Sequence, residues 1–508
     1  MQPSTPVAGA RESLDSLDSR DAAHAADARR AAAQEAQAAH LAYTAPDVHA
    51  RQISARLDRL PPSAPVWLLI GALALGGWFE IYDMFLTAYI GPGLVKAGIF
   101  TKTTASLFDL GGLGAFVAAL FLGLFIGTIG VAFIADRLGR RRVFVGALLC
   151  YTFAAVMMSL QSEAGWIVFW RVIAGIGVGA ELVTIDAYVS EFVPASLRGR
   201  AFAFVQAIQY TSIPTIAFLS WQLVPIAPFG QDGWRWVVWI GCSGAVFVWL
   251  IRLGLPESPR WLIQHGRTAE AEAIVARLER RIERSSGKPL PVVKVASATV
   301  SAPVATSAVD DSPWSKRYRR RTIMLLVFNF FQSIGYYGFA SWVPTLLAEK
   351  GVTLTHSLWY SFLIAIASPL GPLVSMFIAD RVERKWLIVG AAAAMAVLGV
   401  IFAQQRAPAL LVTMGLLMTL AGNCMTFSYR TYQAELFPTR MRARAIGLVY
   451  SASRISAMLS GFLIGFFLRH LGVPGVFALI AGSMCVVMFT IGLFGPRSRG
   501  LSLEQISA

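Results

Sequence analysis

Twelve long apolar stretches, separated by short polar segments, run along the chain from about residue 61 to residue 495. A helix needs about 20 apolar residues to cross the hydrocarbon core of a bilayer, and each stretch is long enough to do so. We expect the stretches to begin near Val66, Gly112, Val143, Gly165, Ala201, Trp234, Thr322, Ser357, Trp386, Pro408, Ala443 and Gly472. The pattern therefore predicts an all-α membrane protein with six transmembrane helices in each half.

The polar segments set the predicted domain boundaries. In order, we expect a cytoplasmic tail that is disordered or partly helical (1–60), a six-helix bundle (61–254), a cytoplasmic loop (255–320), a second six-helix bundle (321–495) and a cytoplasmic tail (496–508). The first tail has no apolar core segment, so we expect no signal peptide. Within the loop, Arg267–Arg284 has the apolar spacing of an amphipathic helix, whereas the composition of Ser285–Ser312 predicts a flexible tether.

Composition supports this class of protein. The 508 residues are 56% hydrophobic and 14% charged, with a mean hydropathy of +0.59. A soluble globular protein of this length is less apolar and carries more charge. Composition therefore excludes a soluble protein and favours an integral membrane protein.

Most of the 44 Lys and Arg residues lie in the tails and in alternate loops. Positive residues favour cytoplasmic loops, so we expect a multi-pass protein of the cell (inner or plasma) membrane with both termini in the cytoplasm. Such loops face anionic lipid, which explains the net charge of +15. Because no basic and aromatic module stands apart from them, we expect no nucleic-acid partner.

The residue types that carry covalent or metal chemistry are poorly placed for it. Cys150, Cys242, Cys424 and Cys485 all fall in apolar stretches, which predicts neither a disulfide framework nor a metal site. We find no metal-ligand cluster and no nucleophile motif such as G-x-S-x-G. We therefore expect that the protein is not an enzyme and binds no cofactor or metal. We also expect it to act as a monomer.

Two motifs occur once in each half of the chain. IADRLGRRR (Ile134–Arg142) returns as IADRVERKW (Ile378–Trp386), and EFVPASLRGRA (Glu191–Ala201) returns as ELFPTRMRARA (Glu435–Ala445). Both pairs have the same offset, which indicates that the halves are duplicated units. Parallel repeats of this kind place a substrate site near the membrane midplane, between two bundles that rock to give alternating access.

These motifs carry a family resemblance. The loop ADRLGRRR resembles the loop signature of the major facilitator superfamily. Its sugar-porter-like branch is similar at RVIAGIGVGAE (Arg171–Glu181), YVSEFVPASLRGR (Tyr188–Arg200) and PESPRWL (Pro256–Leu262). The resemblance runs from about Val66 to Ile506, and it implies the major facilitator fold and secondary active transport.

The repeated charged loops suggest a latch that closes the cytoplasmic side. Its acids can meet helix N-termini or arginines of neighbouring helices, so that the latch favours an outward-open state and breaks when the protein opens inward. The alternative is that these arginines only anchor the helices at the membrane surface. The candidate latch residues are Asp136, Arg137, Arg140, Glu191, Arg198, Asp380, Arg381, Glu435 and Arg442.

The stretch GGWFEIYDMF (Gly76–Phe85) places Glu80 and Asp83 inside the first apolar stretch. An ionised Asp near the bilayer centre costs roughly 2.5–3.5 kcal/mol unless a partner or a water-filled cavity receives it. At 1.5 Å per residue, Arg171 of the fourth stretch lies at the same depth, and we expect it to face Asp83 across an aqueous vestibule. Burial and the guanidinium would then act in opposite directions on the proton affinity of Asp83.

The spacing GGxxxxYD resembles the first helix of sugar porters, in which the Asp is the proton site and an Arg of the fourth helix is its partner. The resemblance implies these roles for Asp83 and Arg171, and the alternative is a permanent ion pair that only holds two helices together. Glu80 is either a second acid or a group solvated by the cavity. Glu181 is a further candidate for proton coupling, and with Asp186 it lies deeper toward the cytoplasm.

The substrate residues of hexose porters are mostly absent. Those porters carry a Gln pair in helix seven, a second Gln late in helix five, and Trp in helices ten and eleven. Here the helix-five position is Ile213, the Trp positions carry Arg430 and Arg454, and Gln206 alone remains. The sequence GAE ending at Glu181 resembles the nicotinate and organic-anion (metabolite:proton symporter) group more than the hexose porters.

Arg454 indicates the class of substrate. It lies near the midplane in YSASRIS, twelve residues after Arg442, a spacing that resembles organic-anion transporters in which an Arg there receives a carboxylate. The alternative is an Arg bonded to backbone carbonyls or to an acid. Arg430 is closer to the cytoplasmic end and can either bind substrate or snorkel to the membrane surface.

Flat apolar faces edged by hydrogen-bonding groups surround Arg454 in the predicted arrangement, which suits a small aromatic carboxylate, although such aromatics also serve as packing or interfacial residues. The further candidates are Gln206, Gln209, Tyr210, Gln332, Tyr336, Tyr337, Phe339 and Trp342. We therefore expect proton-coupled symport of a small organic anion. The alternatives are a proton-coupled sugar or polyol symporter and a membrane receptor that kept the fold without transporting.

Overall fold

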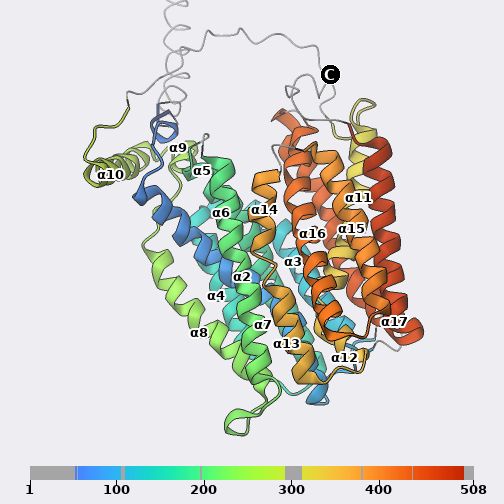
Figure 1. Cartoon of the computed structure of the whole chain (residues 1–508). Coiled ribbons are helices and arrows are strands. Elements are labelled where there is room, and N and C mark those ends of the chain that lie inside the picture. Colours follow the sequence, from blue (N-terminus) through green and yellow to red (C-terminus); the bar gives the residue numbers. More distant parts are fainter. Residues whose placement is uncertain are drawn as a thin grey trace, which may run out of the picture.

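The computed structural model describes residues 52–53, 55–103, 109–194, 197–291, 312–378, 382–437 and 439–496. These residues are almost entirely helical, and they form two groups of helices side by side (Figure 1). The first group contains α2 (Ala64–Lys96), α3 (Leu113–Leu138), α4 (Arg140–Ser159), α5 (Ala164–Phe192), α6 (Arg198–Tyr210), α7 (Ser212–Leu223), the short 3₁₀ helix η1 (Pro228–Gly230) and α8 (Gly233–Leu253).

Two helices of the connecting segment follow, and then the second group. The connecting helices are α9 (Pro259–Gln264) and α10 (Thr268–Ser286), the latter lying where the sequence predicts an amphipathic helix. The second group contains α11 (Arg319–Ala340), α12 (Val343–Glu349), α13 (Leu354–Ala365), α14 (Leu370–Ile378), α15 (Arg384–Gln404), α16 (Pro408–Glu435) and α17 (Thr439–Phe494). Most of the predicted tail (1–60) and most of the predicted tether lie outside the described residues.

The helices supply the twelve membrane crossings that the sequence predicts. Among the described residues, eleven helical segments are long and apolar enough to span a bilayer, and the last of them, Arg444–Phe494, is 51 residues long. Gly472 interrupts this segment with a φ of +65°, close to Pro474. A side chain would strain that conformation, so glycine suits this kink, and the two helices that meet there are together long enough for two crossings.

Small residues let the helices of the first group approach closely. A Cβ added to Gly123 or Gly127 of α3 would lie 2.1 Å from a backbone carbonyl oxygen of α5, and one added to Gly175 or Gly179 of α5 would lie 2.4–2.5 Å from a carbonyl oxygen of α3. Small residues one turn apart allow such close packing in membranes. The packing fixes α5, and Arg171 lies one turn before Gly175.

The two groups also contact each other directly. We call the end of the molecule that carries α9 and α10 the α10 end, and the opposite end the α12 end (Figure 1). Near the α12 end, Trp221 of α7 packs on Trp359 of α13 with ring centroids 4.5 Å apart. Lys102 forms an ion pair with Glu349 of α12 at 3.4 Å. These contacts hold the two bundles together on the far side from α10.

The helix α10 is fastened to the first bundle by the segment that precedes α2. Arg56 and Arg59 each donate a 2.6 Å hydrogen bond to the carboxylate of Glu279 on α10. Beside them, the buried Leu57 of this segment and Val275 of α10 belong to one apolar cluster. The helix is therefore held at a fixed place beside the bundle.

Candidate functional site

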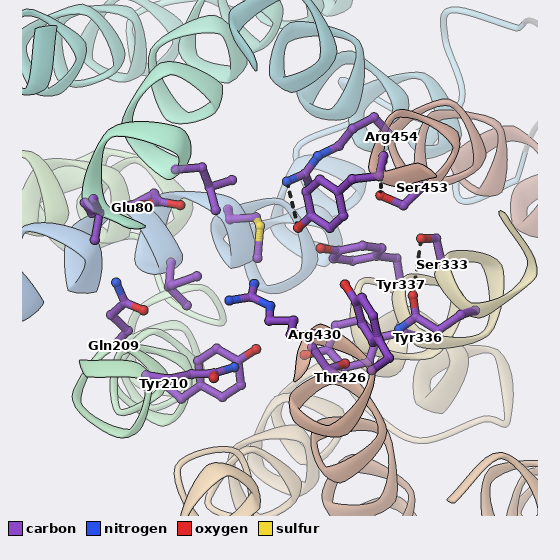
Figure 2. A pocket seen from close by; sticks show the side chains of 18 residues that line it. Glu80, Gln209, Tyr210, Ser333, Tyr336, Tyr337, Thr426, Arg430, Ser453 and Arg454 are labelled. Atoms are coloured by element: carbon purple, nitrogen blue, oxygen red, sulfur yellow. Dashed lines mark hydrogen bonds between the residues drawn. The ribbon is translucent and has the colours of Figure 1, made fainter. Parts of the chain in front are cut away.

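A cavity lies between the two bundles, walled by α2, α5 and α6 on one side and by α11, α16 and α17 on the other (Figure 2). Its volume, as the space open to the centre of a water molecule, is about 50 Å³. Eight of the ten residues that the sequence predicts around the substrate line it: Gln206, Gln209, Tyr210, Gln332, Tyr336, Tyr337, Arg430 and Arg454. Their binding of substrate stays a prediction.

Arg454 is buried on the α17 wall of this cavity, with 3% of its surface exposed. Its Nη2 donates a 3.1 Å hydrogen bond to the Tyr450 hydroxyl, and its guanidinium carbon lies 4.7 Å from the centre of the Tyr450 ring. Its Nε has no hydrogen-bond partner, and no carboxylate pairs with it among the described residues. A buried guanidinium without a counter-ion is costly, so Arg454 favours an anion in the cavity.

Arg430 points into the same cavity from α16 (Figure 2). The interpretation in which this residue snorkels to the membrane surface is therefore wrong. Its side chain follows the inner face of α16, where Thr426 lies one turn earlier on the same wall. The cavity thus receives two guanidinium groups from the second bundle.

The first bundle contributes one carboxyl group and several amides. Glu80 of α2 is 1% exposed and lines the cavity, whereas Asp83 and Arg171 do not line it. The side-chain Nε2 of Gln206 is buried without a hydrogen-bond partner among the described residues. A buried donor left unpaired costs about 1–3 kcal/mol. Unpaired donors therefore face the cavity from both bundles, on Gln206 and on Arg454.

Tyrosine and amide side chains shape the α11 wall. The Tyr336 hydroxyl donates a 2.9 Å hydrogen bond to Asn423, and Ser333 donates a 3.5 Å bond to Gln332. The Tyr337 ring meets Phe121 of the first bundle with centroids 4.6 Å apart and planes at 61°. The wall therefore combines fixed aromatic faces with hydrogen-bonding groups.

Asp83 and Arg171 form a direct ion pair inside the first bundle. Arg171 Nη1 lies 3.0 and 3.1 Å from the two carboxylate oxygens, Nη2 donates to the backbone carbonyl of Asp83, and Nε donates to Thr87 Oγ1 at 3.0 Å. Asp83 is 5% exposed and Arg171 is fully buried. The partners that the sequence predicts for each other are thus in contact.

The expectation that water separates this pair is wrong. Neither residue lines the central cavity, and the side chains touch because the close packing of α5 brings Arg171 against α2. Asp83 instead lines a separate, smaller cavity with Tyr151 and Cys242, in which about 20 Å³ can hold the centre of a water molecule. Glu181 is fully buried on α5 and does not line the central cavity either.

Two aromatic residues predicted near Arg454 lie elsewhere. Phe339 lines a different cavity together with Phe85 and Tyr89, and Trp342 is fully buried away from the central cavity. Successive residues turn about 100° around a helix, so Phe339 faces away from the direction of Tyr337. These two predictions are corrected.

The candidate latch is only partly visible. Asp380 and Arg381, together with the side chains of Asp136, Arg137, Arg140, Asp186, Arg198 and Arg442, lie outside the described residues. Glu191 is half-buried near the end of α5. Glu435 at the end of α16 accepts a hydrogen bond from Arg384 of α15, a partner that the sequence reasoning missed although it lies in the repeated loop.

Sequence reasoning also missed several residues of the central cavity. Those that carry polar groups are Ser333, Thr426, Tyr429, Tyr450 and Ser453. Tyr450 and Thr426 each lie four residues before a cavity arginine, so the helical neighbour rule could have found them. Among the described residues, no cluster of His, Cys, Asp and Glu side chains could hold a metal ion.

Comparison with known proteins gives consistent matches over nearly the whole chain. Residues 70–508 match the family model described as "Sugar (and other) transporter". The putative metabolite transport protein YyaJ of Bacillus subtilis is 32% identical over 87% of this chain and 95% of its own length. The niacin transporter NiaP of Acinetobacter baylyi is 27% identical over 89% of this chain and 99% of its own length.

A solved structure is similar as well. The xylose transporter XylE from E. coli, in a partially occluded inward-open conformation, matches with a TM-score of 0.69 and 18% sequence identity. The match covers 87% of this chain and all of the XylE chain.

Proposed function

Because the chain belongs to the sugar (and other) transporter family of the major facilitator superfamily, we propose that it is a proton-coupled symporter of a small organic anion. The family and the fold confirm the expected twelve-helix major facilitator architecture. The protein is a multi-pass membrane transporter of small molecules and not an enzyme. The anion, the proton and the cytoplasmic placement of both termini are the proposed part.

The observation that carries the proposal is the unpaired guanidinium of Arg454 in the central cavity. A substrate carboxylate would supply its missing counter-ion and accept the unused Nε hydrogen. Arg suits this task because its planar fork matches the geometry of a carboxylate. Gln206 offers a second unused donor from the opposite bundle, so one bound anion would bridge the two halves.

The aromatic lining narrows the proposed substrate class. Tyr336 and Tyr337 present ring faces and edges beside Arg454 in a narrow space, which suits a small planar carboxylate of the nicotinate or benzoate kind. One relative is named as a niacin transporter, which is consistent with this class.

The ion pair of Asp83 and Arg171 is the proposed proton switch. Protonation of Asp83 removes its charge and releases Arg171, which lets the bundle rearrange while the anion docks on Arg454. Glu80 lies one turn from Asp83 and lines the central cavity. We therefore propose that Glu80 relays the proton from the cavity to the buried pair. Discharge of proton and anion to the inside restores the pair, and the latch loops open and close with the cycle.

Coupling to a proton also solves an energetic problem. Importing a monoanion against an interior-negative potential costs about 2.3 kcal/mol per 100 mV. One proton carried in the same direction cancels that charge. A pH gradient would then drive accumulation of the anion.

Uptake by purified protein in proteoliposomes tests the proposal. We expect labelled nicotinate or benzoate to accumulate when the outside is acidic, and to accumulate less without a pH gradient. The uncharged amide of the same ring should enter poorly. Uptake of none of a panel of small carboxylates at either pH would contradict the proposal.

Proton-coupled sugar transport is the second candidate, favoured by the structural match to a xylose transporter and by the amides of Gln206, Gln209 and Gln332 in the cavity. Competition for uptake between sugars and carboxylates distinguishes the two candidate functions. Inhibition of labelled substrate uptake by xylose or glucose, with no effect of benzoate, would establish the sugar alternative. A receptor that does not transport would give no uptake of sugars and none of small carboxylates.

A further inference from the structure

A second large opening lies outside the central cavity, where α10 meets the first bundle. We call it the α10 groove, and its walls are the first turns of α2, the end of α8 and one face of α10. About 690 Å³ of it can hold the centre of a water molecule, far more than in the central cavity. The transport cycle proposed above makes no use of this space.

The groove lies at the depth where the membrane ends. The apolar span of α2 begins at Ala64 and that of α8 ends at Ile251, and both of these helix ends border the groove. Leu68 and Ile251 line it with 66% and 42% of their surfaces exposed. This wall is therefore apolar, uncovered by the residues that the structure describes, and level with the boundary between acyl chains and headgroups.

The opposite wall is basic. Arg277 and Arg281, one turn apart on α10, line the groove and are exposed. Neither forms a hydrogen bond or an ion pair with any residue that the structure describes. Arg141 of α4 lines the groove as well. Arginines placed together in this way suit a phosphate group.

No acid competes for these arginines within the described lining of the groove. Glu279, the neighbour of Leu278 on α10, is bound by Arg56 and Arg59. Glu257 accepts the backbone N–H of Arg141 at 3.2 Å. Arg277 and Arg281 therefore have no acidic partner among the residues that the structure describes, and the hydrogen bonds of Glu279 to Arg56 and Arg59 hold α10 at a fixed distance from the apolar wall.

We propose that the α10 groove binds one anionic phospholipid, with its phosphate on Arg277 and Arg281 and its acyl chains along Leu68 and Ile251. A soluble phosphate would satisfy the arginines but leave the apolar wall uncovered, and a zwitterionic lipid would bring a positive group against the basic wall. The shape and the charge of the groove together select a lipid with net negative charge.

Native mass spectrometry of the purified full-length protein tests this inference. The probes are phosphatidylglycerol and phosphatidylcholine with identical acyl chains, titrated separately. We expect the wild-type protein to retain one phosphatidylglycerol in preference to phosphatidylcholine. Each basic residue near an anionic surface contributes about 1 kcal/mol, so loss of both arginines in R277Q/R281Q should reduce that preference roughly 30-fold.

The matched control is R280Q/R284Q, which removes the same charge from the same helix at two arginines that do not line the groove. We expect it to keep the wild-type preference. Equal retention of the two lipids by wild type, an equal loss in the control, or displacement of phosphatidylglycerol by inorganic phosphate at similar concentration would each overturn the proposal.

A second measurement covers the case in which R277Q/R281Q does not fold. A phosphatidylglycerol with a photoactivatable acyl chain, bound to wild-type protein, should label peptides from the first turns of α2 and the end of α8. Labelling spread over the other helices, with none enriched at these two, would contradict a defined site.

Discussion

The buried arginines Arg171 and Arg454 have different surroundings, and we base their different proposed roles on this difference. The guanidinium of Arg171 is held by the carboxylate and backbone carbonyl of Asp83 and by Thr87, so its charge is already balanced. The guanidinium of Arg454 has the Tyr450 hydroxyl and an unused Nε. The first arrangement suits a charge that is released on protonation, and the second suits a charge that awaits a ligand.

Replacement of Arg454 by Lys is predicted to weaken substrate binding. Lys keeps the positive charge but loses the planar fork, so we expect the KM for a carboxylate substrate to rise on the order of tenfold, with a larger rise for R454Q. Proteoliposome uptake kinetics give this value, with R406Q in the exposed turn before α16 as the control. An unchanged KM in R454Q would show that the anion binds elsewhere.

At the scale of helices, close packing and a charged clasp set the positions on which the site depends. The glycines of α3 and α5 bring Arg171 into contact with Asp83, and Glu279 fastens α10 to the segment before α2. Each arrangement depends on one kind of contact, which makes each one testable by a single substitution.

The α3–α5 contact is predicted to tolerate no added methyl group. In G127A the new Cβ would lie 2.1 Å from the carbonyl oxygen of Ile176, so the helices must separate and we expect the Tm in detergent to fall by several degrees. G146A on α4 is the control, because its Cβ would meet nothing within 4 Å. Equal Tm values for the two variants would refute the packing argument.

The hydrogen bonds of Arg56 and Arg59 to Glu279, which we call the Glu279 clasp, are predicted to break in acid. Burial raises the pKa of Glu279, but the hydrogen bonds and charges of Arg56 and Arg59 outweigh burial and hold this pKa below its usual value. Because this pKa is lower in the folded state, the ionised carboxylate of Glu279 stabilises its contacts with Arg56 and Arg59 at pH values above the ordinary pKa of Glu. This stabilisation is lost as the pH falls through the folded-state pKa.

Hydrogen exchange of α10 and of the segment before α2 measures this opening. After correction for the intrinsic pH dependence of amide exchange, we expect high protection factors at pH 7 and lower ones as the pH falls through the lowered folded-state pKa of Glu279. E279Q should exchange fast already at pH 7. E272Q is the control, because the contact between Glu272 and Arg56 is longer, at 3.5 Å, and more exposed than the contacts of Glu279. Exchange that is independent of pH would contradict the prediction.

At the scale of the whole molecule, the two bundles contact each other near the α12 end through Trp221 and Trp359, and through Lys102 and Glu349. A transporter that works by alternating access must break one set of contacts between its bundles to open on that side. These contacts are therefore the proposed gate on the side opposite to α10.

A cross-link across this gate is predicted to stop transport. We expect W221C/W359C, made after replacement of Cys150, Cys242, Cys424 and Cys485, to lose uptake on oxidation and to regain it on reduction. Each single cysteine variant, treated in the same way, is the control. Full transport by the cross-linked protein would show that these contacts need not open.

Much of this organisation could be predicted from the sequence, because hydrophobic length determines a transmembrane span and a duplicated motif reveals two bundles. The candidate cavity residues could be named because a polar side chain in an apolar helix must face the protein interior. The rotation and packing of helices could not be predicted. Small errors in rotation put Phe339 and Trp342 in the cavity and left two positions open for Arg430, and close packing of α5 replaced the expected vestibule by direct contact.

The most direct test of the account concerns Asp83. Transport by D83N in proteoliposomes should be measured in two ways, as accumulation driven by a pH gradient and as exchange of labelled for unlabelled substrate without a gradient. An Asn cannot gain or lose a proton, so the account predicts that accumulation is abolished while exchange persists. Accumulation at the wild-type level would contradict the proposal that Asp83 and Arg171 couple transport to the proton.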